Sequence, residues 1–260
     1  MAERLGDPKI KLVDAANLAG EHICCAISDA KCRSGYEAKK AYLRQRFAEG
    51  LVFKKFDVRH KVFIEYGPAE SAWLPVEAPG YTVIDCFWVA GAYAGKGHGA
   101  ALLRECIEAS RGGNGVIALS SAKKRPFLAD KAFLAKAGFE VCDQAGPYFE
   151  LLVRKNASTV PAPRFLEPAR TCSLPRRRKG LVAYFSARCP YTDHYVREGL
   201  AAAAGERGIP FELRRIESRA DAMAAPSPFT IFSLFRDGVF VTHEIPAPSK
   251  LAGLLDIEKK

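Results

Sequence analysis

The sequence predicts an α/β protein of the α+β kind, with a mixed sheet flanked by helices and a smaller α/β domain behind it. Three observations predict this class. Several strand-like segments precede the first glycine-rich loop, unlike the alternation of a parallel βαβ array. A proline- and arginine-rich segment interrupts the chain at residues 156–179, and a second strand–helix–strand pattern follows it. The 260 residues suit two domains, since domains cluster near roughly 100–150 residues.

These observations divide the chain into a first domain at residues 1–155, a linker at residues 156–179 and a second domain at residues 180–260. The linker segment contains four prolines and lacks sustained periodicity. Half of the net charge of +10 lies in this segment, which contains six basic residues and one acidic residue, Glu167. We expect a solvated linker rather than a nucleic-acid site, because no zinc finger or RNA-binding aromatic motif accompanies the charge.

Each element of the first domain is expected from local periodicity and punctuation. A strand and two helical stretches come first, and the second stretch ends in glycine, as helices often do. Three strands lead to the glycine loop, and a helix, a strand, a short helix and two closing strands follow it. The expected strands are 9–13, 51–59, 62–66, 81–89, 115–120, 139–142 and 148–153. The expected helices are about 17–27, 35–50 and 131–137, together with one after Gly99 that contains Leu102, Leu103, Cys106 and Ile107.

Several classes of protein are excluded by composition. No apolar run approaches the ~20 residues that span a bilayer, and the first residues lack the apolar core of a signal peptide. We therefore expect a cytoplasmic protein that does not act at a membrane. Eight scattered cysteines without any C-x-x-C pair predict neither a disulfide scaffold nor a zinc ribbon, and we assign no metal site.

The most informative segment is the loop from Val89 to Gly99, which reads VAGAYAGKGHG and leads into an amphipathic helix. Glycines let a backbone turn tightly and present its amides to a ligand. A helix N-terminus adds unpaired N–H groups and the positive end of the helix dipole. The combination predicts a seat for a pyrophosphate group.

The same loop also fits the dinucleotide fingerprint, because Gly95-x-Gly97-x-x-Ala100 matches G-x-G-x-x-G/A. That fold expects a carboxylate at the end of the next strand, where this chain has Ser120 and Ser121 followed by basic residues, which NADP could tolerate. The preceding sheet is the stronger evidence against it. A dinucleotide fold usually opens with this strand and loop, whereas about 80 structured residues come first here.

The loop resembles the acetyl-CoA signature of the GNAT N-acetyltransferase superfamily. Val89, Tyr93, Gly97 and Gly99 match its pattern, whereas Ala94 replaces the usual Gln or Arg. A later family element is similar to residues 133–139, FLAKAGF. The resemblance implies a mostly antiparallel mixed sheet and an acyltransferase that moves an acetyl group from acetyl-CoA to an amine. The cofactor-binding residues that it implies are Trp88, Val89, Ala94, Gly95, Lys96, Gly97, His98, Gly99 and Ala100.

A narrower resemblance comes from residues 21–27 and 50–55. They are similar to a group that pairs a GNAT domain with a YoaP-like C-terminal domain.

Acetyl transfer requires polarisation of the thioester carbonyl, a base for the amine and a proton donor for the thiolate. In the superfamily, a bulge in the strand that ends here at Val89 splays it from its neighbour. The resemblance gives carbonyl polarisation to a backbone N–H at Val89 or Trp88. The usual tyrosine donor is replaced by Leu134, so Tyr148, Cys142 and Cys86 are the candidate donors.

Two carboxylates are candidates for the base. Asp85 interrupts an apolar strand, and Glu65 lies on the preceding one. A carboxylate among apolar neighbours can have its pKa raised toward neutrality. Strand alternation leaves open whether Asp85 instead faces solvent.

A second group of interest is made of His22, Cys24, Cys25 and Cys32, which lie where the family covers its acceptor. Thiolates and an imidazole could bind a soft metal or a thiol-bearing substrate, or the cysteines could simply pack in the core. Both interpretations stay open.

The second domain begins with a strand that runs into Cys189-Pro190-Tyr191-Thr192 at a helix start, and this pattern resembles the thioredoxin/glutaredoxin fold. The resemblance implies a cis-proline near Thr230, facing the cysteine. Thr192 replaces the resolving cysteine, which leaves a monothiol site or an inert cysteine as alternatives.

The acceptor itself is not legible, so a small-molecule amine and a peptide both remain. The alternative function is a catalytically weak CoA-binding sensor, or a thiol- or metal-binding protein, whose second domain binds a partner.

Overall fold

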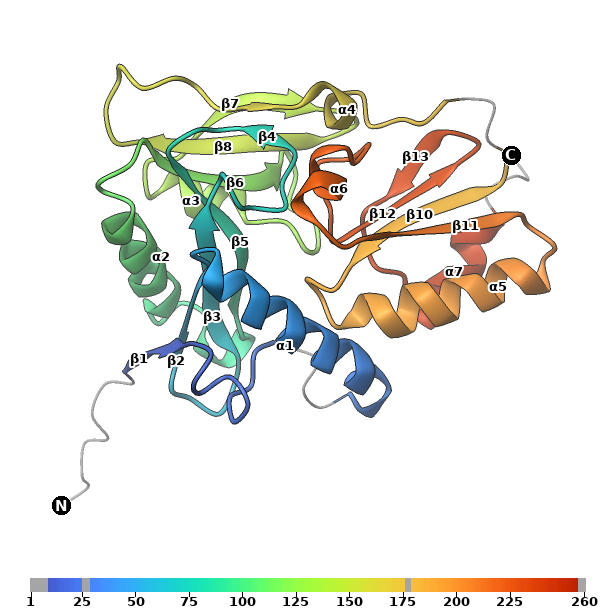
Figure 1. The fold of residues 1–260 in the computed structure, drawn as a ribbon, viewed down its shortest axis with the longest axis horizontal. Helices are drawn as coiled ribbons and strands as arrows, with labels where there is room; N and C mark the ends of the chain where they lie inside the picture. The colour runs from blue at the N-terminus through green and yellow to red at the C-terminus, as the bar shows by residue number, and fades with distance from the viewer. Residues whose placement is uncertain (1–8, 25–28, 176–178, 257–260) are drawn as a thin grey trace.

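The computed structural model describes residues 9–24, 29–175 and 179–256, and its first part is built on one seven-stranded sheet (Figure 1). The strand order is β1-β2-β3-β5-β6-β8-β7. Only β5 and β6 pair in parallel among these described strands, so the expected mixed, mostly antiparallel sheet is confirmed. The strands are β1 (Ile10–Val13), β2 (Val52–Phe56), β3 (Val62–Pro68), β5 (Tyr81–Val89), β6 (Gly115–Ser121), β7 (Glu140–Ala145) and β8 (Phe149–Lys155).

Helices cover both faces of this sheet. On one face, α2 (His98–Ala109) and α3 (Lys131–Ala135) bury Leu102, Leu103 and Leu134 against the strands. On the other face, α1 (Arg33–Ala48) buries Tyr42 and Leu43. Because Leu134 lies in this core, the position where the family carries its tyrosine donor is filled by a packing side chain.

The first expected helix, at about residues 17–27, is wrong for its described part. Residues 15–20 form turns instead, and residues 25–28 lie outside the described chain. The side chain of Asp14 accepts hydrogen bonds from the backbone N–H groups of Ala16 (2.9 Å) and Asn17 (3.2 Å). Such local bonds compete with a helix for the same backbone groups.

The second part contains a four-stranded sheet in the order β11-β10-β12-β13, in which only β10 and β11 are parallel among the described strands. A long helix, made of η4 (Asp193–Leu200) and α5 (Ala201–Glu206), connects the two parallel strands. The remaining elements are β10 (Leu181–Ser186), β11 (Phe211–Ile216), α6 (Arg219–Met223), β12 (Phe232–Arg236), β13 (Val239–Thr242) and α7 (Pro248–Leu255).

The segment between the two parts packs against the first sheet. Its strand β9 (Arg164–Phe165) pairs with β4 (Val76–Glu77), and α4 (Glu167–Arg170) follows. Phe165 is 2 % exposed, and Arg170 forms two hydrogen bonds of 2.8 Å to the carboxylate of Asp143. This segment therefore has regular structure that its prolines and charges did not predict.

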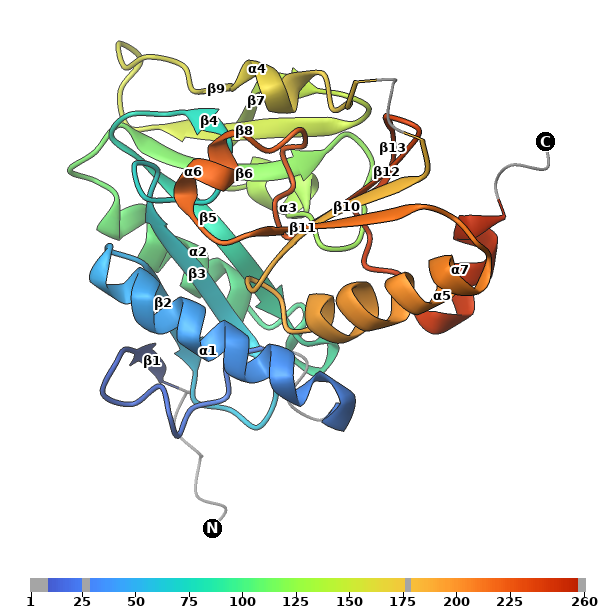
Figure 2. The same cartoon turned by 45° about the vertical axis from the view of Figure 1, so that its right-hand side comes forward.

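The two parts meet along the face of the first sheet that carries α1, and the long helix of the second part begins beside the N-terminal end of α1 (Figures 1 and 2). A single buried cluster contains Tyr42 and Trp73 from the first part together with Phe185 and Phe232 from the second. Gly35 of α1 lies so close to the turn after β10 that a Cβ there would be 2.1 Å from the carbonyl oxygen of Pro190. The interface is a packed core rather than a loose contact.

Candidate functional site

The glycine loop is exposed and adopts the backbone that its glycines allow. Gly95 and Gly97 have φ angles of +74° and +80°, in the left-handed region that favours glycine. A Cβ atom at either position would meet no atom within 4 Å, so the space beside the loop is open. The helix α2 starts at His98, and its first-turn amides lie next to this space. The loop therefore has the form that a pyrophosphate seat requires.

The strand β5 carries the expected bulge, and the bulge lies at Asp85. Before it, Tyr66 is opposite Ile84, and after it Glu65 is opposite Cys86, so Asp85 has no partner of its own on β3. The parallel pairing of β5 with β6 ends at Ile84 and Ala118. The last five residues of β5 therefore have no paired residue on β6, which creates the gap that the resemblance implies.

The direction of the backbone amides at this gap follows from one hydrogen bond. The N–H of Ala90 donates to the carbonyl oxygen of Lys61 at 3.0 Å, on the β3 side. Because successive amides of a strand alternate in direction, Val89 directs its N–H into the gap and Trp88 directs its N–H toward β3. Of the two expected positions, the geometry favours Val89.

The helix start and the strand end are adjacent. A Cβ atom at Gly99 would lie 3.2 Å from Cγ2 of Val89 and 3.5 Å from the ring of Phe87. The absence of a side chain at Gly99 therefore lets the first turn of α2 approach the end of β5. Around the loop, Lys96 Nζ lies 5.6 Å from the ring centre of Tyr93, and His98 packs against the same ring.

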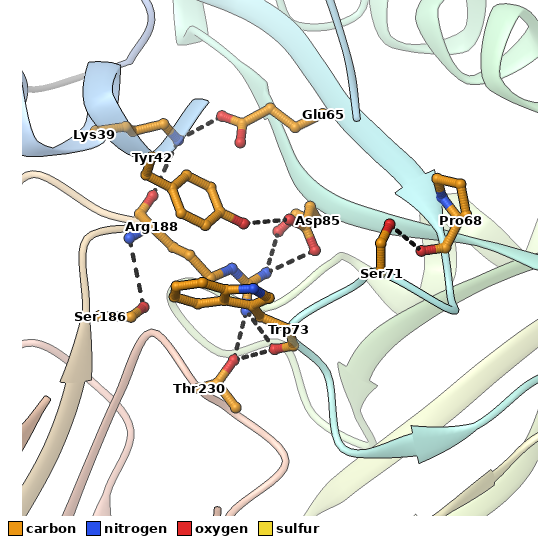
Figure 3. A network of polar contacts seen from close by, with 10 residues as sticks. All are labelled: Lys39, Tyr42, Glu65, Pro68, Ser71, Trp73, Asp85, Ser186, Arg188 and Thr230. Atoms are coloured by element: carbon orange, nitrogen blue, oxygen red, sulfur yellow. Dashed lines mark hydrogen bonds and ion pairs between the residues drawn. The ribbon is translucent and has the colours of Figure 1, made fainter. Parts of the chain in front are cut away.

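Asp85 does not face solvent, although strand alternation allowed it. Its side chain is 2 % exposed and pairs with Arg188 of the second part, whose Nη2 lies 3.0 Å from Oδ1 (Figure 3). The hydroxyl of Tyr42 donates to Oδ2 at 3.1 Å. Alternation places Asp85 on the same face as Tyr81 and Val83, toward α1, and the bulge adds Cys86 to that face. This face is covered by α1 and the second part rather than open to solvent.

Glu65 is also buried on this face and forms an ion pair with Lys39 of α1, with Nζ 2.5 Å from Oε1 (Figure 3). Burial raises the pKa of Glu65 above its ordinary value, although the ammonium group of Lys39 opposes the shift. Lys39 also donates to the carbonyl oxygen of Arg188 at 3.0 Å. The two expected carboxylates thus belong to one buried network that joins both parts of the chain.

The candidate proton donors lie elsewhere. The hydroxyl of Tyr148 is 2.6 Å from Nδ1 of His243, and Nε2 of His243 is 2.9 Å from the carbonyl oxygen of Pro126. Burial raises the pKa of Tyr148 to about 12. Cys142 lies on β7, three strands from β5, and burial raises its pKa to about 12 as well. Cys86 is closer, since it lies on β5 itself, opposite Glu65.

The described thiols and imidazoles do not form a metal site. In the described parts of the chain, no group of three or more His, Cys, Asp or Glu residues is placed to hold a metal ion. His22 lies beside the ammonium group of Lys55, 3.3 Å away, and Cys32 donates to Asp29 at 3.5 Å. Cys24 is buried, and Cys25 lies outside the described residues.

Cys189 is partly buried where α1 packs against the second part. It lines a cavity of about 10 Å³, room for one water molecule, together with Gly35 and Ala38 of α1. The hydroxyl of Thr192 donates to the carbonyl oxygen of Ser186 at 2.8 Å. The expected cis-proline near Thr230 is wrong, because the cis peptide in the described chain precedes Pro147.

Sequence patterns did not predict three residues of the network: Lys39, Tyr42 and Arg188. Lys39 and Tyr42 are three residues apart on α1, which places both on one face of the helix. Arg188 directly precedes the Cys189-Pro190 turn. Asp85 itself is a signal for such residues, because a carboxylate inside an apolar strand must be paired or protonated and therefore predicts a buried partner.

The fold and the loop define the class of protein, and comparison with known proteins agrees. Residues 31–139 match the acetyltransferase (GNAT) family, and residues 210–252 match the YoaP-like family. The chain is 37 % identical over 242 residues to the uncharacterized N-acetyltransferase YoaP of Bacillus subtilis (strain 168), covering 92 % of this chain and 95 % of that protein. The chain belongs to this YoaP family of GNAT-type N-acetyltransferases, which confirms both resemblances.

Several of the solved structures similar to the chain contain a bound ligand. One is the PaiA N-acetyltransferase of Thermoplasma acidophilum in complex with coenzyme A, at 17 % identity and a TM-score of 0.39, covering 56 % of this chain and 99 % of that one. Another is a GNAT family acetyltransferase of Brucella melitensis in complex with acetyl-CoA, at 17 % identity and a TM-score of 0.35, covering 60 % and 92 %. None of the described helices of the chain is long and apolar enough to cross a membrane.

Proposed function

We propose that the chain transfers an acetyl group from acetyl-CoA to an amine of a small molecule or a peptide. One observation carries the proposal. The bulge at Asp85 and the end of the β5–β6 pairing direct the Val89 N–H into a gap, next to the glycine-opened start of α2. An anion seat and a carbonyl-polarising amide lie side by side, as acetyl transfer from a thioester requires.

Each group of the chain has a separate task in this proposal. Acetyl-CoA supplies the activated acetyl group. The amides of residues 94–100 hold the pyrophosphate, and the open space beside Gly97 leaves room for it. The Val89 N–H stabilises negative charge on the carbonyl oxygen as the amine attacks. Trp88 is exposed, and its side chain is on the face of β5 opposite to that of Val89. We assign the acceptor's approach to the side that Trp88 borders.

We assign the base to Glu65 rather than Asp85. Each oxygen of the Asp85 carboxylate already accepts a hydrogen bond, one from the Arg188 guanidinium and one from the Tyr42 hydroxyl, so Asp85 serves as the fixed partner of Arg188. Glu65 has a raised pKa, which suits a base. Glu65 is opposite Cys86, and Cys86 is three residues before Val89 on β5, a separation of roughly 10 Å along the strand. The proton of the attacking amine must therefore reach Glu65 through water.

We propose that the second part is a thioredoxin-like domain that serves as a structural partner of the first. The element order strand, helix, strand, helix, strand, strand, helix and the sheet order β11-β10-β12-β13 support the fold. The packing of α1 against the Cys189-Pro190 turn supports the role, because the turn that would carry thiol chemistry is covered.

A second candidate is a CoA-binding sensor with little catalytic activity. The observation in its favour is Leu134, which is fully buried at the position of the family's proton donor. Tyr148 does not replace that donor freely, because its hydroxyl is bound to His243.

Titration calorimetry of the full chain with acetyl-CoA tests the binding step, with NADP as the control ligand. Release of free CoA thiol in the presence of an amine panel tests the transfer. We expect acetyl-CoA to bind and at least one amine to accelerate CoA release. Binding without acceleration by any amine would favour the sensor, and binding of NADP alone would refute both candidates.

A further inference from the structure

Arg188 belongs to the second part but has most of its contacts in the first. Its guanidinium is buried, and Nη2 donates to the backbone oxygen of Asp85 at 3.2 Å as well as to Oδ1 at 3.0 Å (Figure 3). Nη1 donates to the carbonyl oxygen of Trp73 at 3.2 Å and to Oγ1 of Thr230 at 2.6 Å. One side chain of the second part is thus fixed to the residue that forms the β5 bulge.

The bulge decides which amide of β5 enters the gap. Ahead of it, Ala69 N–H bonds to Tyr81 O, and the hydrogen-bonded pairs of that register continue as Gly67 with Val83. Continued without a bulge, the same register would pair Val89 with Lys61. In the structure, Ala90 bonds to Lys61 instead. The extra residue therefore frees the Val89 N–H, and a slip by one residue would remove it from the gap.

A bulge leaves its extra residue outside the ladder, and a buried backbone oxygen there needs another partner. Arg188 supplies that partner for Asp85. It also neutralises the Asp85 carboxylate, which would otherwise be a buried unpaired charge. Lys39 bonds to the carbonyl oxygen of Arg188 and so fixes the turn from which the guanidinium extends.

We propose that Arg188 is a positioning residue for acetyl transfer, through which the second part holds the β5 bulge and keeps the Val89 N–H in the gap. The inference rests on the proposed function for the role of this amide. Its structural core, that Arg188 fixes the register of β5, is independent of that function. The second part would therefore be required for the geometry of the reaction centre and not only for stability.

The test compares the full chain with Arg188→Met by residue-resolved hydrogen exchange of β5. In the wild type, we expect the amides of Phe87 and Val89 to exchange faster than those of Trp88 and Ala90. In Arg188→Met, this order should be lost, with Val89 exchange slowed by about tenfold as its amide enters the ladder. Arg170→Met is the matched control, because it removes an arginine–aspartate pair at the bulge of β7 in the same sheet. It should leave the β5 order unchanged.

The second readout uses acetyl-CoA labelled with ¹³C at its carbonyl. In the wild type, the carbonyl stretch should shift to lower frequency on binding, and in Arg188→Met this shift should shrink while the Kd changes less than about threefold. Arg188→Lys, which keeps the charge but not the fork of donors, should lie in between and serves if Arg188→Met does not fold.

The outcomes separate the two proposals. A wild type that does not bind acetyl-CoA would refute the proposed function, while the exchange pattern would still test the inference. Protection of Val89 in the wild type, or an unchanged exchange order in both Arg188 variants, would overturn the inference.

Discussion

Gly97 is the last residue before α2. Its backbone conformation disfavours a side chain, whereas its surroundings leave space for one. Its φ of +80° disfavours any L residue, while the space around it is open. Gly208 has the same two properties, with φ of +63° and no neighbour within 4 Å, but lies in the second part. The pair therefore separates backbone strain from the loss of a ligand site.

We predict that Gly97→Val loses at least tenfold in acetyl-CoA affinity, whereas Gly208→Val keeps the wild-type affinity. Both variants should lose a similar stability of about 1–2 kcal/mol, because the backbone penalty is the same. Calorimetry with acetyl-CoA and thermal unfolding measure the two effects. Equal affinity in both variants would remove the loop from the binding site.

Glu65 leads to a prediction about pH. A base must be deprotonated to work, and burial raises the pKa of Glu65 above its ordinary value. The wild-type kcat/KM should therefore fall as the pH drops through this raised pKa. Glu65→Gln cannot accept the proton, so its rate should be reduced by about 10²-fold or more and should lack this acidic limb.

Asp85→Asn is the matched control, because it alters a second buried carboxylate of the same network without removing the proposed base. It should keep the acidic limb. A pH–rate profile over several amine concentrations measures both variants. If Asp85→Asn loses the limb and Glu65→Gln keeps it, the two roles are exchanged.

At the scale of elements, α1 carries the contact between the two parts. Gly35 lies against the backbone of Pro190, where a Cβ atom would be 2.1 Å from the carbonyl oxygen. Backbone cannot move aside as a flexible side chain can. Gly205, by contrast, lies in α5 with no neighbour within 4 Å. Both glycines are helical, so alanine should be favourable for the helix itself at each position.

We predict opposite effects of the same substitution. Gly35→Ala should lower the free energy of unfolding by about 1–3 kcal/mol, because the new methyl group forces α1 away from the turn. Gly205→Ala should raise it by up to about 1 kcal/mol. Urea unfolding of the full chain measures both. A Gly35→Ala chain at least as stable as the wild type would mean that the two parts are not closely docked.

The elements that the sequence predicted are those set by local chemistry. The turn at Gly138, the loop at residues 95–99 and the helix after it need only neighbouring residues to be recognised, and the structure contains them. The environment of Asp85 could not be predicted with the same rules. Alternation places it on the face of Tyr81 and Val83, but whether that face is open or covered depends on α1 and on Arg188, about 100 residues away in sequence. The bulge that moves Cys86 to the same face depends on the partner strand.

At the scale of the whole molecule, the second part contacts the first at several separate places. Arg188 reaches the β5 bulge, His243 bonds to Pro126 beyond the end of β6, and Tyr195 donates to Asp29 ahead of α1 at 3.0 Å. Such contacts between distant segments leave no trace in local periodicity. This explains why the composition of the linker suggested that the two units are more independent of each other than they are.

Residues 164–170 of the segment between the parts pack against the first part. Residues 164–165 pair with β4 in antiparallel orientation, Phe165 is buried, and Arg170 is bound to Asp143. A first domain that ends at Lys155 would lack all three. Burial of a phenylalanine alone contributes about 1.5–3 kcal/mol. A chain that ends at Leu174 would keep these contacts while lacking Arg188.

We therefore predict that residues 1–174 unfold at a higher urea concentration than residues 1–155, and that both are less stable than the full chain. Where folded, each shortened chain should bind acetyl-CoA within about threefold of the full-chain affinity, because the loop and α2 are intact. Both should turn over at least tenfold more slowly, since Arg188 no longer holds the β5 bulge. Calorimetry, urea unfolding and CoA release measure the three quantities.

Equal stability of the two shortened chains would make the segment a simple tether. A 1–174 chain that stays unfolded would show that the first part cannot fold without the core that it shares with the second, and the boundary near residue 155 would then be wrong.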